Sequence, residues 1–540
     1  MSLPPGVTER DFNLALRQFE LAVGREWVFT SDEDVALYRD AYSPFWNEPE
    51  DRVASAAVAP QSVEEVQAVV RAANEYRIPI YPISTGRNLG YGGSAPNLSG
   101  SVVLDLKRMN RVLEVDDRNH YAVVEPGVSY FDFYRHIQER GLKVWIDCPD
   151  PGWGSVIGNA LDRGGGYTLG MYRNHFEAHC GIEVVLANGE VLRTGMGAMP
   201  GAKTWQQYRS GVGPYIDGLF SQSNFGVVTK MGFWLMPEPE AFRSGVVGVP
   251  RHADLVPLVD TLNYLENTGQ MTGMPFLGSP VLSANMAGVD ASPDTVSREP
   301  PLTLTASPED FDAYTKRNKV PAWTVELRFY GAPEVVDAQW AAAKRRYAAA
   351  IPGATFTDLA RYEMPLSEEQ LQQVHKVAFG IPNLSIFSLG ARSEMNPTPT
   401  SGHVWFSPIV PRTGEAVFEA QRVLSAAVAD LDTPLIGLVA LPSTFWTRAF
   451  IFIIGFPISH DVEANRKVRA AFEKVVRISA EHGWGEYRTA PAFQDLVMST
   501  YSHGDHVLRR FNEALKDAVD PNGIISAGRY GIWPRHLRKP

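Results

Sequence analysis

Residues 84 to 93 read Ser84-Thr85-Gly86-Arg87-Asn88-Leu89-Gly90-Tyr91-Gly92-Gly93, directly after the apolar run Ile78–Ile83, which predicts a β-strand. Glycines that follow a strand let the backbone approach a phosphate, so the stretch predicts a loop that holds a phosphate-containing ligand. It matches neither familiar template. The dinucleotide fingerprint requires Gly-x-Gly-x-x-Gly opening a helix, and a P-loop requires Lys-Ser/Thr, where this chain has Ser94-Ala95-Pro96.

A second glycine cluster lies farther along the chain. It runs from Gly152-Trp153-Gly154-Ser155 through Gly158 to Gly164-Gly165-Gly166. Two such clusters indicate that the backbone approaches one long ligand at two places. The alternative is that both clusters are tight turns without a ligand.

The flanking segments predict two kinds of architecture. In the first half we expect a helix that begins at the capping box Ser62/Glu65 and ends at Arg77–Pro79, strands over Val102–Leu106 and Tyr121–Glu125, a helix over Ser129–Arg140, and a hairpin over Ile182–Thr194 with Asn188-Gly189 at its tip. After the proline-rich residues 237–240 we expect strands over Trp323–Tyr330, Val404–Ile409, Leu435–Leu441 and Ala449–Ile458, and helices over Val335–Ala350, Glu415–Ala429 and Asp461–Glu481. This order favours an antiparallel sheet backed by helices, and hence the α+β class.

Composition excludes several classes of protein. The 540 residues include 50 basic and 61 acidic side chains, giving a net charge of −11 without a basic tail, so nucleic acid and anionic membranes are not expected partners. Two cysteines provide neither a disulfide framework nor a cysteine-rich metal site, and we expect no metal. No secretory signal is visible in residues 1–9, and the apolar run 449–458 is too short to span a bilayer, so we expect a cytoplasmic enzyme.

The loop at 84–92 resembles that of the vanillyl-alcohol oxidase and p-cresol methylhydroxylase flavoproteins, and the bacterial eugenol oxidases in particular. The resemblance continues, in order, through Asp147-Cys148-Pro149-Asp150, Gly154-Ser155, Gly158-Asn159, Ser221-Gln222-Ser223-Asn224-Phe225-Gly226, Ser401-Gly402-His403-Val404-Trp405-Phe406-Ser407-Pro408, Glu486-Tyr487-Arg488-Thr489 and Pro521-Asn522-Gly523-Ile524-Ile525. It implies a PCMH-type FAD-binding domain over 1–240, an α+β, ferredoxin-like substrate-cap domain over 241–485, and a C-terminal return over 486–540 that completes the FAD domain.

The resemblance also implies the cofactor, FAD, and its site. The implied FAD-binding residues are Ser84, Thr85, Gly86, Arg87, Asn88, Gly90, Tyr91, Pro149, Asp150, Gly154, Ser155, Gly158, Asn159, Asp162, Gly165, Gly166, Tyr167, Gly226, Val228, His403, Arg488 and Arg529. His403 aligns with the histidine that is bonded covalently to the flavin 8α-methyl; the cytochrome-linked p-cresol methylhydroxylases have a tyrosine there. The alternative is a structural histidine, one of the 12 in the chain. Arg529 replaces a lysine common in relatives.

Tyr91, Tyr487 and Arg488 resemble the trio that binds the substrate as a phenolate in this family. A phenolate is the better hydride donor, and lowering the pKa of a phenol from about 10 to about 7 requires about 4 kcal/mol. A charge-assisted hydrogen bond contributes about 1.5–3 kcal/mol, so three donors are sufficient and one is not. The alternatives are turn packing for Tyr91 and a surface ion pair for Tyr487 and Arg488.

The remaining predicted site residues surround the para side of the substrate. Asp150 resembles the family's acid near flavin N5, which stabilises a p-quinone methide and activates water; the alternative is a turn or cap aspartate between Pro149 and Pro151. On one strand face, His403, Trp405 and Ser407 would place Trp405 beside the para substituent, with core packing as its alternative. Either Tyr167 or Tyr172 lines the pocket, in a segment that departs from the family.

The resemblance therefore implies an FAD-dependent oxidase of para-substituted phenols such as 4-alkylphenols, 4-alkylguaiacols, eugenol and vanillyl alcohol. Hydride passes from the benzylic carbon to flavin N5, and O2 reoxidises the flavin to give H2O2. Within enzymes, the alternatives are a cytochrome-linked 4-alkylphenol dehydrogenase and a sugar or hydroxy-acid oxidase. A non-catalytic flavin-binding protein is the alternative of another class. We also expect a homodimer.

Overall fold

The computed structural model describes residues 3–88, 90–282, 284–285, 299–385, 402–429 and 441–538. Leu89 of the glycine loop, and the predicted strand Leu435–Leu441 except its last residue, lie outside these ranges. Within the described ranges, no helix is both long and apolar enough to cross a membrane.

The first sheet has the order β1-β2-β4-β3, formed by β1 (Val28–Phe29), β2 (Ala56–Val58), β4 (Val102–Asp105) and β3 (Ile80–Ile83). β2, β4 and β3 are parallel, whereas β1 is antiparallel to β2. Helices α1 (Glu9–Val23) and α3 (Val63–Glu75) pack on each other and bury their apolar residues in the same core. α3 begins as predicted at Ser62, whose hydroxyl accepts a hydrogen bond from the amide of Glu65. The carboxylate of Glu65 accepts its hydrogen bond from the amide of Gln61 and not from that of Ser62, so the predicted capping box is incomplete.

A second, antiparallel sheet has the order β5-β6-β10-β8-β9. Its strands are β5 (Val112–Asp116), β6 (Tyr121–Val124), β10 (Val227–Trp234), β8 (His179–Val185) and β9 (Val191–Arg193). β8 and β9 form the predicted hairpin, with Gly189 at φ +81° in its turn. Helix α4 (Tyr130–Glu139) has a complete capping box between Ser129 and Asp132.

β7 (Val144–Trp145) pairs with β11 (Met236–Pro237). The third sheet, called the cap sheet here, follows β11 in the chain. It has the order β14-β13-β15-β12-β16, formed by β14 (Ala284–Asn285), β13 (Phe276–Ser279), β15 (Trp323–Gly331), β12 (Ala241–Val249) and β16 (Thr355–Glu363). α7 (Leu255–Asn267) connects β12 to β13, and α9 (Pro333–Ala350) connects β15 to β16. Strands β13-β15-β12-β16 are therefore ordered as in the ferredoxin-like βαββαβ unit, and the predicted α+β class is confirmed.

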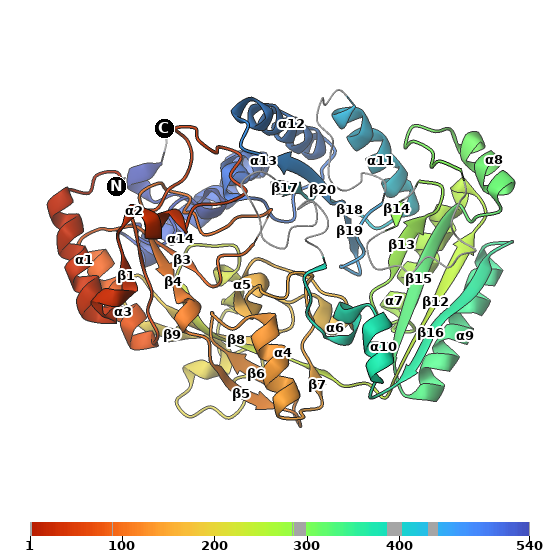
Figure 1. Cartoon of the computed structure of the whole chain (residues 1–540), viewed down its shortest axis with the longest axis horizontal. Helices are drawn as coiled ribbons and strands as arrows, with labels where there is room; N and C mark the ends of the chain where they lie inside the picture. Colours follow the sequence, from red (N-terminus) through yellow and green to blue (C-terminus); the bar gives the residue numbers. More distant parts are fainter. Residues whose placement is uncertain are drawn as a thin grey trace.

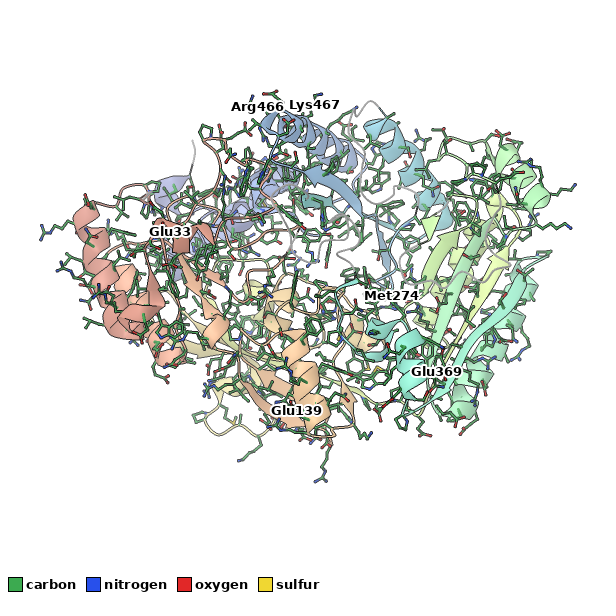
Figure 2. The ribbon with its side chains drawn as sticks, viewed as in Figure 1. Glu33, Glu139, Met274, Glu369, Arg466 and Lys467 are labelled. Carbon is green, nitrogen blue, oxygen red and sulfur yellow. The ribbon has the colours of Figure 1, made fainter. Side chains whose placement is uncertain are left out.

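The cap sheet lies at one end of the molecule, and both chain termini lie at the other (Figure 1). Met274 lies between the cap sheet and the rest of the chain (Figure 2) and is buried in the core cluster that also contains Ile182 and Met231 of the antiparallel sheet. The two regions therefore share part of one hydrophobic core.

The chain then continues through further helices and returns to the first sheet. Further helices are α8 (Pro308–Asn318), α10 (Glu368–Gln373), α11 (Gly414–Val428), α12 (Val462–Glu481), α13 (Gln494–Thr500) and α14 (His503–Val519). Ile525 then pairs in parallel with Ile80 of β3, so the end of the chain extends the sheet that precedes the glycine loop.

Two predicted strands are broken in the structure. The expected strand 404–409 is β17 (Gly402–Phe406) followed by β18 (Ile409–Pro411), and the expected strand 449–458 is β19 (Ala449–Ile451) followed by β20 (Ile454–Ile458). β17 pairs with β20 and β18 pairs with β19, so the two predicted strands are interrupted opposite each other. Ser407 and Pro408 lie between the two strand segments, and the hydroxyl of Ser407 contacts Tyr91 beside Gly90, which the rings of His403 and Trp405 face.

Candidate active site

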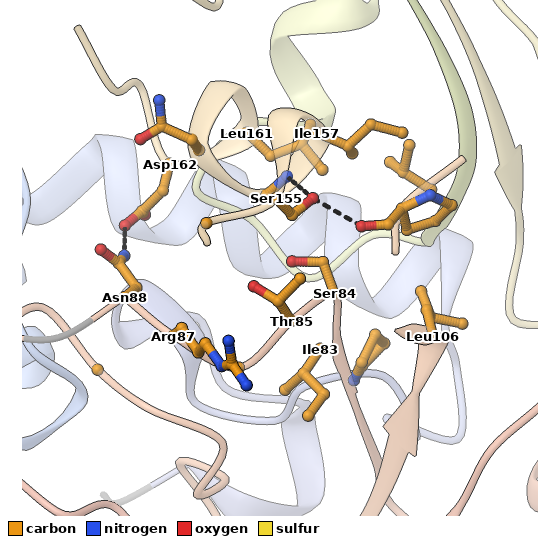
Figure 3. Close-up of a pocket in the computed structure, with 18 of the residues that line it drawn as sticks. Ile83, Ser84, Thr85, Arg87, Asn88, Leu106, Ser155, Ile157, Leu161 and Asp162 are labelled. Carbon is orange, nitrogen blue, oxygen red and sulfur yellow. Dashed lines mark hydrogen bonds between the residues drawn. The ribbon is translucent and has the colours of Figure 1, made fainter. Parts of the chain in front are cut away.

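The glycine loop and the second glycine cluster face each other across a cavity (Figure 3). Its lining includes most of the predicted FAD-binding residues, namely Ser84, Thr85, Gly86, Arg87, Asn88, Tyr91, Pro149, Gly154, Ser155, Gly158, Asn159, Asp162, Gly226, Val228 and Arg529. Ser155 begins the short helix α5 (Val156–Leu161) by accepting a hydrogen bond from the amide of Gly158 at 2.9 Å. Its hydroxyl donates to the carbonyl of Pro126 at 2.6 Å. We call this space the first cavity.

Glycine is required where the two loops approach each other. A Cβ atom on Gly158 would lie 2.3 Å from Oγ of Ser84, and Gly86 has φ +67°. A side chain at Gly158 would displace the hydroxyl of Ser84, and Gly86 adopts a backbone conformation that side chains disfavour. Residues of both glycine clusters line the same cavity, which the interpretation as tight turns alone does not explain.

Asp162 joins the cavity wall to the C-terminal return. Its carboxylate accepts hydrogen bonds from the amide of Asn88 and from the hydroxyl of Tyr530, the latter at 2.5 Å. The guanidinium groups of Arg529 and Arg488 lie 3.4 and 3.9 Å from it. One buried carboxylate thus positions the glycine loop, the C-terminal return and one member of the predicted phenolate trio.

Tyr91, Tyr487 and Arg488, the predicted trio, converge in the structure. The guanidinium of Arg488 lies over the ring of Tyr91 at 4.0 Å and the ring of Tyr487 at 5.1 Å from the ring centres. The hydroxyls of Tyr91 and Ser407 are 2.6 Å apart, and the hydroxyl of Tyr487 donates to the carbonyl of Arg163. The side chain of Arg488 is only 15% exposed, so the alternative of a surface ion pair is wrong.

Burial determines the protonation of the trio. It raises the pKa of the hydroxyl of Tyr91 and that of Tyr487, with Arg488 opposing the shift in both. Both phenols therefore keep their protons at neutral pH and can donate hydrogen bonds. Nε and Nη1 of Arg488 are buried and have no hydrogen-bond partner within the described residues. Such donors are costly to leave unpaired, so the trio is suited to an anionic oxygen.

Asp150 is hydrogen-bonded to Tyr167, one of the two tyrosines that the sequence left open. The hydroxyl of Tyr167 donates to the carboxylate of Asp150, and its ring packs on Phe276 and His375. Tyr172 packs instead in a cluster around Trp145. Burial raises the pKa of Asp150 to about 6, with the bond from Tyr167 opposing the shift.

His403 lies on β17, behind the glycine loop. The residue is 5% exposed, and its Nδ1 atom has no hydrogen-bond partner among the residues that the structure describes. Burial lowers the pKa of its imidazole to about 4, so the ring is neutral. A Cβ atom on Gly90 would lie 2.3 Å from the ring of Trp405 and 2.9 Å from that of His403, which places both rings against the loop.

Known proteins resemble this chain over its whole length. Residues 54–195 match the family described as FAD binding domain. The 4-cresol dehydrogenase [hydroxylating] flavoprotein subunit of Pseudomonas putida is 35% identical over 540 residues, covering 98% of this chain and 97% of the relative. The chain belongs to the vanillyl-alcohol oxidase and p-cresol methylhydroxylase family.

Solved structures of this family share the fold. The 4-ethylphenol oxidase of Gulosibacter chungangensis, in complex with isoeugenol, has a TM-score of 0.82 at 34% identity and covers 99% of this chain and 100% of that one. p-Cresol methylhydroxylase with substrate bound has a TM-score of 0.81 at 32% identity, covering 98% and 99%. The relatives thus include both an oxidase and the flavoprotein subunit of a dehydrogenase, and the fold does not distinguish between them.

The residues present fit the cofactor of this flavoprotein family. The glycines of the first cavity admit a ligand close to the backbone, and the unpartnered Nδ1 of His403 offers a neutral nitrogen. Seven predicted FAD-binding residues do not line the first cavity: Gly90, Asp150, Gly165, Gly166, Tyr167, His403 and Arg488. Several of these belong to the trio or to the Asp150–Tyr167 pair. Trp405, which was predicted to lie beside the para substituent of the substrate, also does not line the first cavity. Its ring contacts that of His403, with 4.3 Å between the ring centres.

The sequence left some residues of the family site unassigned. Tyr81, Gln222 and Ser526 line the first cavity, and Tyr81 accepts a hydrogen bond from Arg529 at 2.9 Å. Gln222 lies in a segment that resembles the family, so its motif was an available signal. Glu486 precedes Tyr487 directly, yet nothing in the local pattern shows that its carboxylate contacts the backbone amide of Ser407.

Proposed function

We propose that the protein oxidises para-substituted phenols at the benzylic carbon, with FAD as the hydride acceptor and O2 as the final oxidant. The convergence of Tyr91, Tyr487 and Arg488 is the observation that carries this proposal. The relatives support the substrate class, because their names specify 4-cresol and 4-ethylphenol. Candidate substrates are 4-alkylphenols, 4-alkylguaiacols, eugenol and vanillyl alcohol.

The trio would bind the phenolic oxygen. Arg488 supplies a permanent positive charge. The hydroxyl of Tyr91 supplies a hydrogen bond, and that of Tyr487 supplies another once it turns from the carbonyl of Arg163. A phenolate pushes electron density toward its para carbon, which promotes loss of hydride from the benzylic position. The energy needed to ionise the phenol, about 4 kcal/mol at neutral pH, is within the range of three charge-assisted hydrogen bonds.

Asp150 would act at the para side. A carboxylate with a pKa of about 6 is largely ionised at neutral pH and is still basic enough to accept a proton. It would stabilise the electron-poor quinone methide and take a proton from the water that adds to it. The bond from Tyr167 fixes the direction of the carboxylate.

Anaerobic mixing with 4-ethylphenol tests the proposal. Bleaching of the flavin followed by recovery and H2O2 formation in air is the result expected of an oxidase. Bleaching without recovery would favour the cytochrome-linked dehydrogenase that the Pseudomonas putida relative exemplifies. If 4-ethylphenol, eugenol and vanillyl alcohol all leave the spectrum unchanged, the substrate class is wrong.

The rate of flavin reduction should depend on the ionisation of Asp150. Because its pKa is raised to about 6, the ionised fraction grows with rising pH. We expect the rate to increase about tenfold between pH 5 and pH 7. Stopped-flow reduction across this range measures the change. Asp150→Asn should be slower and lose this acidic limb; a limb of the same midpoint in the variant would assign the titration to another group.

His403 should hold the flavin covalently. In wild type, the protein band should fluoresce under ultraviolet light after denaturing electrophoresis, because a covalent flavin stays with the chain. His403→Ala should lose this band while keeping bound flavin in its native state, since the first cavity is intact. Trp405→Phe, which alters the neighbouring ring only, is the matched control. A fluorescent band in His403→Ala would exclude this residue as the attachment site.

We also infer that residues 1–240 and 486–540 form the FAD-binding domain, that 241–485 form the substrate cap, and that the protein is a homodimer. The pairing of Ile80 with Ile525 supports the first inference. Limited proteolysis and light scattering test the domain limits and the dimer.

A further inference from the structure

Asp147 is a buried carboxylate to which the proposed reaction gives no role. It lies between β7 and Asp150 in the chain, and its side chain is 2% exposed. Its Oδ1 atom accepts a hydrogen bond from the amide of Tyr167 at 3.1 Å. Its Oδ2 atom accepts one from the amide of Thr168 at 2.7 Å and another from the hydroxyl of Thr168. Two successive backbone amides are thus held by one side chain.

His175 donates a further hydrogen bond to Asp147. Its Nε2 atom lies 2.9 Å from Oδ1 of Asp147, and its Nδ1 atom lies 2.5 Å from the side-chain amide nitrogen of Asn159. An amide nitrogen can only donate, so Nδ1 accepts and the Nε2–H group donates to Asp147. Asn159 lines the first cavity, whereas neither His175 nor Asp147 does. The hydrogen bonds therefore run from the wall of the first cavity to the backbone of Tyr167.

The glycines before Tyr167 let the backbone come close to these side chains. A Cβ atom on Gly166 would lie 1.3 Å from Oδ1 of Asp147 and 2.7 Å from Nε2 of His175. A Cβ atom on Gly164 would lie 2.0 Å from Oδ1 of Asn159. Only glycine permits so close an approach. The second glycine cluster therefore fixes Tyr167 against Asp147 as well as lining the first cavity.

Asp147 holds both members of the Asp150–Tyr167 pair. Asp150 follows it by three residues in the chain, and the amide of Tyr167 is bonded to it directly. The ring of Tyr167 packs on Phe276, with 5.9 Å between ring centres, and on Phe445, with 5.3 Å. Because its backbone and its ring are both fixed, the hydroxyl of Tyr167 keeps one direction, toward the carboxylate of Asp150.

We propose that Asp147 and His175 are positioning residues that hold the hydroxyl of Tyr167 on the carboxylate of Asp150. Neither residue lines the first cavity, so their effect on the reaction passes through Tyr167. The inference rests on the proposed function, in which Asp150 acts at the para side of the substrate. It adds to that function the groups that keep Asp150 paired with its hydrogen-bond donor.

The pKa of Asp150 reports whether this pairing is kept. Burial raises that pKa to about 6, and the bond from Tyr167 opposes the shift. If Tyr167 were displaced, the bond would weaken and the pKa would rise further. Asp150 would then lose its proton only at a higher pH, and the acidic limb of flavin reduction would move in the same direction.

Other titratable and charged groups face the pair from the cap side. His375 lies against the ring of Tyr167, with 5.4 Å between ring centres, and Arg328, which is paired with Glu326, lies 3.1 Å from Nδ1 of His375. Burial lowers the pKa of His375 to about 3, with Arg328 adding to the shift. Burial also raises the pKa of Tyr167 well above its ordinary value, so its hydroxyl remains a donor. Neither ring therefore titrates in the range in which Asp150 does.

Infrared titration of the flavin-loaded protein tests the positioning without turnover. The carbonyl band of protonated Asp150 is the band that Asp150→Asn lacks, and its loss with rising pH gives the midpoint. Tyr167→Phe should raise this midpoint by about 1–2 pH units, because a hydrogen bond to a charged group is lost. His175→Phe, which removes a donor to Asp147, should raise it by about 0.5–1 pH unit. His503→Phe, at an exposed position, is the matched control and should keep the wild-type midpoint.

A double variant separates positioning from a merely structural role. If His175 acts through the hydroxyl of Tyr167, the variant that carries both His175→Phe and Tyr167→Phe should have the midpoint of Tyr167→Phe alone. A His175→Phe midpoint equal to that of wild type overturns the proposal. A double variant whose midpoint lies well above that of Tyr167→Phe overturns it as well.

Asp147→Asn gives an independent arm, which also serves if His175→Phe does not fold. Loss of a nearby negative charge alone would lower the midpoint of Asp150, whereas a displaced Tyr167 raises it. We expect a rise, and a fall or an unchanged midpoint contradicts the positioning. Stopped-flow reduction by 4-ethylphenol should show the acidic limb move by the same amount in each variant. If the infrared midpoints move as expected while no phenol reduces the flavin, the positioning holds and the proposed function fails.

Discussion

Arg488→Gln is expected to slow anaerobic flavin reduction by 4-ethylphenol about 100-fold, which corresponds to about 2.7 kcal/mol of transition-state stabilisation. Arg488 is the cation of the trio, and its guanidinium lies over both tyrosine rings. Glutamine can donate hydrogen bonds but carries no charge, so the phenol would remain protonated and would be a poor hydride donor. Stopped-flow spectroscopy at saturating substrate gives the rate constant.

Arg163→Gln is the control for this variant. The side chain of Arg163 is exposed, and the group that Tyr487 contacts is its backbone carbonyl, which the substitution keeps. Its rate should stay within about threefold of wild type, a difference of less than 1 kcal/mol. Flavin content, measured by absorbance, verifies that both variants bind FAD. If Arg488→Gln reduces the flavin as fast as Arg163→Gln, the trio does not ionise the substrate.

Lys516→Met is expected to lower the free energy of unfolding by about 3–5 kcal/mol. Lys516 is fully buried, and its ammonium donates to the carboxylate of Asp520 at 2.7 Å and to the carbonyls of Asn224 and Ile525 at 2.7 and 2.6 Å. Methionine would leave a buried carboxylate without its cation and two carbonyls without a donor. These contacts hold the C-terminal return against the segment that carries Asn224.

Chemical denaturation of the FAD-loaded protein measures this effect. Lys203→Met, at an exposed position, should change the free energy of unfolding by less than about 0.5 kcal/mol. The return carries Arg529 and Tyr530, which contact Asp162, so Lys516→Met should also release flavin more readily than the control. A midpoint of unfolding equal to that of Lys203→Met would show that this buried pair makes no net contribution.

Local features of the fold follow from short stretches of sequence. The capping residues Ser62 and Ser129 begin their helices because the bonds that they make span only three residues. Asn188-Gly189 sets the hairpin because a tight turn needs a positive φ, which Gly189 adopts. The broken strand at 404–409 was predicted as continuous because its apolar residues do not reveal that β17 and β18 pair with different partners.

The site depends on contacts between distant parts of the chain. Tyr91 and Ser407 are 316 residues apart, and Tyr487 and Arg163 are 324 apart. The resemblance to a family assigned Tyr91, Tyr487 and Arg488 to one site, and the structure brings their side chains into contact. The resemblance could not distinguish Tyr167 from Tyr172, because only the folded chain shows which hydroxyl reaches Asp150.

The sequence by itself thus determined the glycine loops, the limits of helices α3, α4, α9, α11 and α12 to within about two residues, the α+β class and, through its motifs, the family. These depend on backbone conformations and hydrogen bonds that involve only a few neighbouring residues. The tertiary structure alone decided the break between β17 and β18 at Ser407, the hydrogen-bond partner of Asp150, the four contacts of Asp162 and the burial of Glu486. Each of these depends on the electrostatic environment and the distance between groups that only the folded chain brings together.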